Sequence, residues 1–127
     1  MVYLVKNILQ QGGIMGCYEV NIKEGMPTVE AARIRLDQAL RTAKARRYPA
    51  VKIIHGYGSS GKGGAIKRDV QAFLAQKKRG GAISGFVGGE DFSPFSADSR
   101  AITDRLPQLK NDKDYSRGND GITIVLL

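Results

Sequence analysis

Residues 50–64 read Ala50-Val51-Lys52-Ile53-Ile54-His55-Gly56-Tyr57-Gly58-Ser59-Ser60-Gly61-Lys62-Gly63-Gly64. The apolar run around Lys52 predicts a strand in the interior of a sheet. The glycines that follow permit positive φ angles and let backbone N–H groups approach a ligand closely. Helical periodicity begins at Ile66, so the glycine-rich segment joins a strand to a helix. The free N–H groups and the dipole at such a helix start favour phosphate.

Strands and helices alternate on both sides of this stretch. Strands are predicted from apolar alternation or short apolar runs, and helices from apolar residues three and four positions apart. Thr28 and Ser93 are typical helix N-caps, Pro94 suits the first residue of a helix, and Gly80-Gly81 ends one. In chain order we predict a strand over 17–22, a helix over 29–46, the strand over 50–54, a helix over 66–79, a strand over 82–87, a short helix after Ser93 and a strand over 121–127.

This order, βαβαβαβ, predicts an α/β domain with a partly parallel sheet and helices packed against it. The 127 residues suit one domain, which we place over 16–127, with 1–15 as an N-terminal extension of uncertain structure. No apolar run is long enough to span a membrane, and the amino end lacks the pattern of a secretory signal. We therefore expect a cytoplasmic protein.

Neither a metal site nor a cofactor is expected. One cysteine and one histidine exclude an internal disulfide and a zinc site made of these residue types alone. The acids Glu90, Asp91 and Asp98 match no ligand spacing that defines a metal site.

Positive charge is concentrated in the middle of the chain. Residues 30–80 hold 13 lysines and arginines against 3 acids, a net charge of +10, whereas the rest holds 7 against 9, a net charge of −2. Such a distribution is typical of a protein that binds a polyanion, because each neutralised phosphate releases condensed counterions. The alternative is a solvated helical surface with no charged partner.

The glycine-rich segment nearly matches the phosphate-binding loop of nucleotide hydrolases. Gly56, Gly61 and Lys62 reproduce the spacing of that motif between a strand and a helix. Gly63 stands where the motif has a serine or threonine hydroxyl for magnesium. The partial match supports contact with phosphate and argues against nucleotide hydrolysis.

A second resemblance covers more of the chain. The segment from Val51 to Ser59 resembles the HGxGxG region of the small MutS-related (Smr) domain family, and Gly118-x-x-Gly121 followed by a strand with Thr123 resembles its last motif. The resemblance implies a two-layer α/β sandwich with a four-stranded mixed sheet, similar to the C-terminal domain of bacterial initiation factor three. It also implies binding of nucleic acid, DNA or RNA, and several members cleave it.

The chain departs from the family pattern at its first motif. The family usually has Leu-Asp-x-His-Gly after the first strand, whereas this chain has Asn21 and Lys23 at the positions of the acid and the imidazole, with Glu24 out of register. The glycine-rich segment is also longer than usual, and residues 88–120 resemble an insertion. We therefore expect binding to be retained, and endonuclease activity to be weak or absent.

Two aromatic side chains allow two interpretations each. His55 could act as a general acid or base on a phosphodiester, or could hold the loop by hydrogen bonds to its backbone. Tyr57 could stack on a base or anchor the loop. The predicted nucleic-acid- and phosphate-binding residues are Gly56, Tyr57, Gly58, Ser59, Ser60, Gly61, Lys62, Gly63, Gly64, Lys67, Arg68 and Lys23.

Four functions remain open at this point. The leading one is an Smr-like domain that binds nucleic acid through the glycine-rich segment and the cations beside it. The others are an Smr-type endonuclease that uses His55, a small module that binds a phosphorylated ligand, and a protein-interaction domain that uses 88–120.

Overall fold

A computed structural model describes residues 16–57 and 61–127. It confirms the alternating order of strands and helices and the four-stranded mixed sheet. Two 3₁₀ helices, η1 and η2, flank the last α-helix. The elements are β1 (Cys17–Asn21), α2 (Val29–Ala45), β2 (Ala50–Ile54), α3 (Gly61–Arg79), β3 (Gly85–Gly88), η1 (Gly89–Asp91), α4 (Ala97–Arg105), η2 (Pro107–Asn111) and β4 (Ile122–Leu126).

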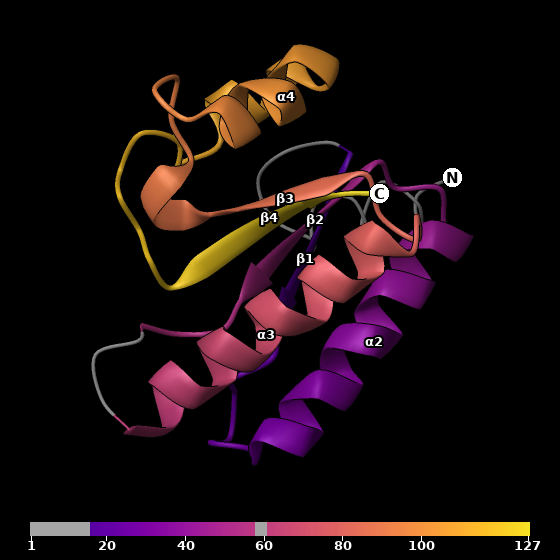
Figure 1. Ribbon diagram of the computed structural model, residues 1–127, viewed down its shortest axis with the longest axis vertical. Helices are drawn as coiled ribbons and strands as arrows, with labels where there is room; N and C mark the ends of the chain where they lie inside the picture. Colours follow the sequence, from indigo (N-terminus) through magenta and orange to yellow (C-terminus); the bar gives the residue numbers. More distant parts are fainter. Residues whose placement is uncertain (1–15, 58–60) are drawn as a thin grey trace, which may run out of the picture.

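The sheet has the strand order β1-β2-β4-β3 (Figure 1). Strands β1 and β2 are parallel, and β4 runs antiparallel to both of its neighbours, β2 and β3. Asn21, the last residue of β1, pairs in register with Ile54, the last residue of β2. Because the two strands are parallel, the segments that follow them leave the sheet side by side. This register places the glycine-rich segment beside the chain that follows β1.

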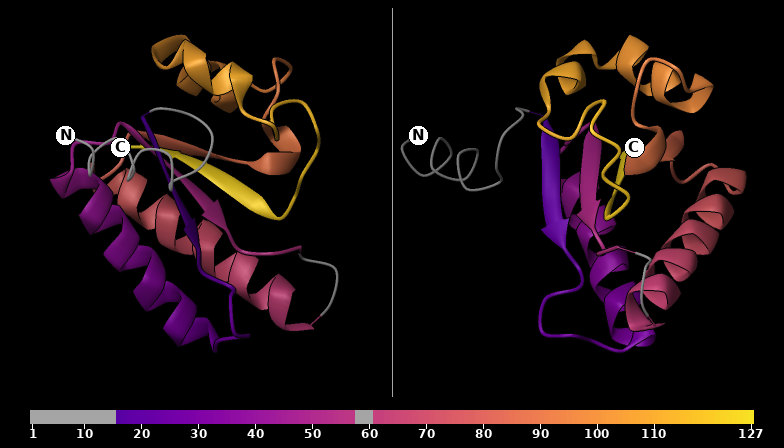
Figure 2. Two further views of the ribbon diagram at one scale, coloured as in Figure 1. Left: turned by 180° about the vertical axis from the view of Figure 1, so that it is seen from behind. Right: turned by 90° about the vertical axis from the view of Figure 1, so that its left-hand side faces the viewer.

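Both faces of the sheet are covered. Helices α2 and α3 pack on one face, where Val51, Ile53 and Val125 belong to their hydrophobic cluster. The segment 89–120 covers the other face with Phe92, Ile102 and Leu109. The ribbon views show the sheet between the α2–α3 layer and this segment (Figures 1 and 2). The predicted insertion is therefore a second cover for the sheet, and all residues of β4 are buried.

The ends of α2 and α3 have the expected capping geometry. Thr28 Oγ1 accepts a hydrogen bond from the Ala31 backbone N–H at 3.1 Å, which confirms the predicted N-cap. Gly81 has φ +78°, and the Ala82 N–H donates to the Lys77 carbonyl at 2.9 Å, as in a Schellman motif. Arg47, with φ +61°, holds the corresponding left-handed position after α2.

Two predicted boundaries of the middle of the chain were wrong. The second helix begins at Gly61, so residues 61–64 form its first turn and the loop before it is shorter than predicted. The third strand begins at Gly85 and not at Ala82, because the N–H of Ala82 still closes the C-terminal cap of α3.

The predicted cap of the short helix was also wrong. The helix α4 starts after Ser96, whose Oγ accepts a hydrogen bond from the Ser99 N–H at 3.2 Å. Ser93 instead accepts one from the Phe95 N–H at 3.2 Å, which forms a local turn. A serine hydroxyl serves either purpose, and only the chain direction after residue 93 decides between them.

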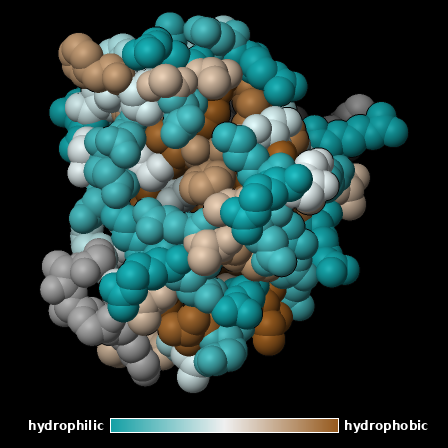
Figure 3. All heavy atoms as spheres, viewed as in Figure 1, coloured by the Kyte–Doolittle hydropathy of each residue, from teal (hydrophilic) through white to brown (hydrophobic). Residues whose placement is uncertain are grey.

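The surface is largely polar on the face seen in Figure 3, where hydrophilic residues surround smaller apolar areas. Among the helices within residues 16–57 and 61–127, none is long and apolar enough to cross a membrane.

Candidate nucleic-acid interface

The beginning of the glycine-rich segment is hydrogen-bonded to Gly121, the residue before β4. The backbone N–H groups of His55 and Gly56 both donate to the Gly121 carbonyl, each at 3.0 Å. Gly56 has φ +85°, a conformation that a residue with a side chain rarely adopts. The chain therefore turns sharply out of β2 at a fixed point.

His55 is completely buried below this turn. Its Nδ1 lies 2.9 Å from the Gly56 carbonyl oxygen, and its Nε2 lies 2.8 Å from Thr123 Oγ1. A carbonyl only accepts, so Nδ1 carries the proton, and in the neutral ring Nε2 accepts from the Thr123 hydroxyl. Burial lowers the pKa of His55, which favours this neutral form. With both nitrogens engaged inside the protein, the geometry favours the interpretation in which His55 holds the loop.

The burial of His55 predicts a pH-dependent stability. The unfolded chain binds a proton on this histidine near its ordinary pKa of 6.5, whereas the folded chain binds it only at lower pH. The free energy of unfolding should thus be fully retained above about pH 7 and fall as the pH drops from there towards 5, by at most about 1.4 kcal/mol per pH unit. Chemical denaturation between pH 5 and 7.5 measures this slope.

A His55→Asn variant is the control for that slope. It keeps a donor and an acceptor but has no titrating group, so its stability should change less over this range. The carboxyl groups of Glu90 and Asp114 have lowered pKa values and act only at more acidic pH. An equal slope in the wild type and the variant would contradict the prediction.

Lys23 lies across the backbone of Gly56. A Cβ atom placed on Gly56 would be 2.9 Å from Lys23 Cδ, so the aliphatic part of the lysine occupies that space. The contact follows from the parallel register, because both residues lie two positions beyond the paired ends of β1 and β2. Asn21 Oδ1 accepts the Lys23 N–H at 3.0 Å and fixes the turn between them. Two predicted site residues are thereby brought together.

Tyr57 combines a contact with a large exposed area. A Cβ atom placed on Gly121 would be 3.4 Å from Tyr57 Cδ1, so one edge of the ring faces the start of β4. The residue is nevertheless 61% exposed. The structure therefore supports an anchoring contact and also leaves the ring accessible for stacking.

The start of α3 forms the end of the glycine-rich segment and carries further positive charge. Its first turn contains no acid, whereas the first turns of α2 and α4 contain Glu30 and Asp98. Arg68 is exposed and forms no ion pair with the residues that the structure describes. The positive end of the α3 dipole is thus uncompensated by its own first turn.

The remaining predicted site residues are either outside the described residues or paired within the protein. Gly58, Ser59 and Ser60 lie outside the described residues, and so does the side chain of Lys62. Lys67 is not a free cation, because its Nζ lies 2.8 Å from Glu90 Oε2.

A chain of polar contacts that no sequence pattern predicted supports the loop from the face of the sheet that the segment 89–120 covers. The Gly121 N–H donates to Asn119 Oδ1 at 3.0 Å, and Asn119 Nδ2 donates to Asp114 Oδ1 at 3.0 Å. Asp114 forms an ion pair with Lys52, which also binds Asp112 Oδ1 at 2.9 Å. The segment 89–120 is therefore connected to the turn at Gly56 through Gly121.

The Lys52 side chain is only 3% exposed. Burial disfavours its charge, but the hydrogen bonds to Asp114 and Asp112 outweigh that cost and raise the pKa of Lys52. Burial likewise opposes the charge of Asp114, and the hydrogen bonds from Asn119 and Lys52 outweigh it and lower the pKa of Asp114. A lysine inside an apolar strand was the sequence signal that such acids were needed.

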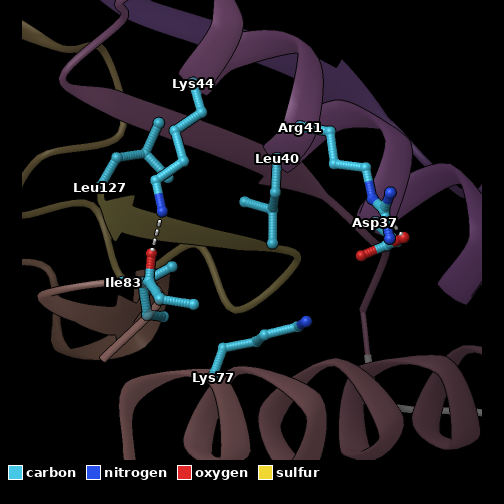
Figure 4. A pocket seen from close by; sticks show the side chains of 8 residues that line it. Asp37, Leu40, Arg41, Lys44, Lys77, Ile83 and Leu127 are labelled. Atoms are coloured by element: carbon cyan, nitrogen blue, oxygen red, sulfur yellow. Dashed lines mark hydrogen bonds and ion pairs between the residues drawn. The ribbon is translucent and has the colours of Figure 1, made fainter. Parts of the chain in front are cut away.

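Many cations of the +10 region serve the fold. A cavity of about 250 Å³ lies between the C-terminal halves of α2 and α3 (Figure 4). At this cavity Arg41 pairs with Asp37 at 2.9 Å, and Lys44 Nζ donates to the Ala82 carbonyl at 2.8 Å. These side chains lie at the ends of the helices opposite to the start of α3.

Comparisons with known proteins agree with the sequence resemblance. Residues 24–86 match the Smr domain family. The fold is similar to the crystal structure of the Smr domain of Thermus thermophilus MutS2, with a TM-score of 0.53 and 23% sequence identity over 86% of this chain and 95% of that chain. None of the curated proteins compared with the chain matches it. The predicted resemblance is confirmed.

Proposed function

We propose that this chain binds nucleic acid through one defined surface, because residues 24–86 match the Smr domain family and the fold is similar to that of an Smr domain. Smr domains are generally linked to nucleic-acid binding or endonuclease activity. The surface, called the loop surface below, consists of Lys23, Gly56, Tyr57, the first turn of α3 and Arg68. Phosphates are held by the cations and by the N–H groups at the start of α3.

One observation carries this proposal: Lys23 lies across Gly56, the residue that directly precedes the exposed Tyr57. A cation, an accessible aromatic ring and a helix start without acids occupy one edge of the sheet. Single-stranded nucleic acid offers the matching groups, because its phosphates bind cations and its unpaired bases stack on aromatic rings. Backbone and stacking contacts carry little sequence information, so we expect weak sequence preference.

We assign His55 a positioning role in this function. Its imidazole is buried and bonded to Gly56 and Thr123, so it does not face a phosphodiester on the surface. Asn21 and Lys23, at the positions of the family's acid and imidazole, give no second group suited to proton transfer, since a lysine is a poor base unless burial lowers its pKa. The loop surface thus supports binding more strongly than cleavage.

Removing two cations beside the loop should weaken binding about tenfold or more. We expect this for Lys62→Ala/Arg68→Ala, because each cation that contacts a phosphate contributes through counterion release. The midpoint of thermal unfolding should change little, since Arg68 is exposed and exposed charges contribute little to folding. Fluorescence anisotropy with short single- and double-stranded DNA and RNA at low salt measures the affinity.

The matched control removes two cations from the other end of the same helix. Lys78→Ala/Arg79→Ala makes the same change in net charge, and both residues are exposed. Its effect should stay within about threefold, because only the general field changes. Equal losses in the two double variants would contradict a localised loop surface. Cleavage of the probe by the wild type, abolished in His55→Ala, would support the endonuclease alternative instead.

A further inference from the structure

An acid from the segment 89–120 is bound to a cation of α3 beside the loop surface. Glu90, in η1, places Oε2 2.8 Å from Lys67 Nζ. The side chain of Lys67 is 13% exposed and that of Glu90 is 38% exposed. Solvent therefore reaches the carboxylate, while the lysine is directed toward it.

The position of Glu90 is fixed relative to the loop. A Cβ atom on the preceding residue, Gly89, would lie 1.8 Å from the Asn119 carbonyl oxygen, so η1 packs tightly against the chain just before β4. That same chain continues to Gly121, whose carbonyl accepts the N–H groups of His55 and Gly56. The Glu90 carboxylate and the turn out of β2 are thus attached to one short stretch of backbone.

We propose that Glu90 is an internal competitor of nucleic acid for Lys67. Its carboxylate occupies the ammonium group that a phosphate would otherwise bind, and its negative charge repels phosphates on the loop surface. This inference rests on the proposed function of the loop surface. It adds a residue that sets how strongly charged a ligand must be in order to bind there.

The ion pair has the properties of an exchangeable contact. A partly exposed lysine–carboxylate pair contributes little net stability, so a phosphate can replace the carboxylate at small cost. A strand with several adjacent phosphates gains the remaining contacts of the loop surface and displaces Glu90. A ligand with a single phosphate gains few such contacts and is disfavoured by the same carboxylate.

Replacing the carboxylate should strengthen binding. In Glu90→Gln the side chain keeps its shape and loses its charge, so Lys67 becomes available to a phosphate. We expect about fivefold tighter binding of a single-stranded oligonucleotide at about 100 mM salt. The dependence of log K on log salt should change little, because the strand displaces Glu90 and binds Lys67 in the wild type too.

Asp91→Asn is the matched control, because Asp91 is the next residue, is exposed, and forms no ion pair with the described residues. It removes the same charge without releasing Lys67, and its affinity should stay within about twofold of the wild type. In a Lys67→Met background, Glu90→Gln should give no more than this general effect. Thermal unfolding of every variant verifies that the protein is folded.

The outcomes separate this inference from the proposed function. If the wild type binds and Glu90→Gln binds no more tightly than Asp91→Asn, Glu90 is no competitor, while the loop surface stands. Weaker binding by Glu90→Gln would show that the carboxylate positions Lys67 for binding, which also overturns the inference. If neither the wild type nor any variant binds at low salt, the proposed function itself fails.

Discussion

Raising the salt concentration from about 50 to about 200 mM should weaken nucleic-acid binding about 50- to 150-fold. This range corresponds to four phosphate contacts, with the lower value for single strands and the higher one for duplexes. The phosphate contacts expected are Lys23, Lys62, Arg68 and Lys67, which the strand frees from Glu90. Affinity measurements at four or more salt concentrations give the slope of log K against log salt concentration directly.

This slope also gives the number of cations that contact phosphates in the complex. The +10 region would suggest a larger value, but Arg33 pairs with Asp69 and Arg41 with Asp37 within the folded chain. In Lys62→Ala/Arg68→Ala the slope should fall by about 1.4 to 1.8, the share of two phosphates. An affinity that does not change between the two salt concentrations would contradict phosphate binding altogether.

Replacing Lys52 with methionine should lower the free energy of unfolding by about 3–5 kcal/mol. The change removes the cation between Asp112 and Asp114 and leaves two carboxylates under the segment 89–120 without their partner. Methionine has a similar length and fills the space, so the loss reports the uncompensated charge and not a cavity. Urea denaturation of the wild type and the variant at pH 7 measures the difference.

Removing the two acids as well provides the control. Lys52→Met/Asp112→Asn/Asp114→Asn has no buried charge at this place and should recover most of the lost stability, since neutral replacements of a buried ion pair cost far less than breaking it. A loss below about 1 kcal/mol in the single variant would show that the two acids find other compensation. A triple variant as unstable as the single one would assign the loss to packing.

Local sequence patterns predicted most of the helices and strands of this protein, although not the cap of α4. Apolar periodicity, the Thr28 cap and the Gly80-Gly81 stop are properties of neighbouring residues, and all of them correspond to elements of the structure. The turn after β2 was likewise evident from its glycines, although the start of α3 was predicted late because glycines are poor helix formers. The Smr resemblance was evident too, since its motifs are contiguous in the chain.

Which charges are available for binding depends on contacts between residues far apart in the chain. Lys52 and Asp112 are 60 residues apart, and Lys67 and Glu90 are 23 apart, so no local pattern pairs them. His55 finds Thr123 across 68 residues because β2 and β4 are neighbours, and Lys23 reaches Gly56 because β1 and β2 are parallel and in register. The sequence gives only the number of charged residues. The strand register and the path of the segment 89–120 determine whether each charge is neutralised inside the fold or exposed to a ligand.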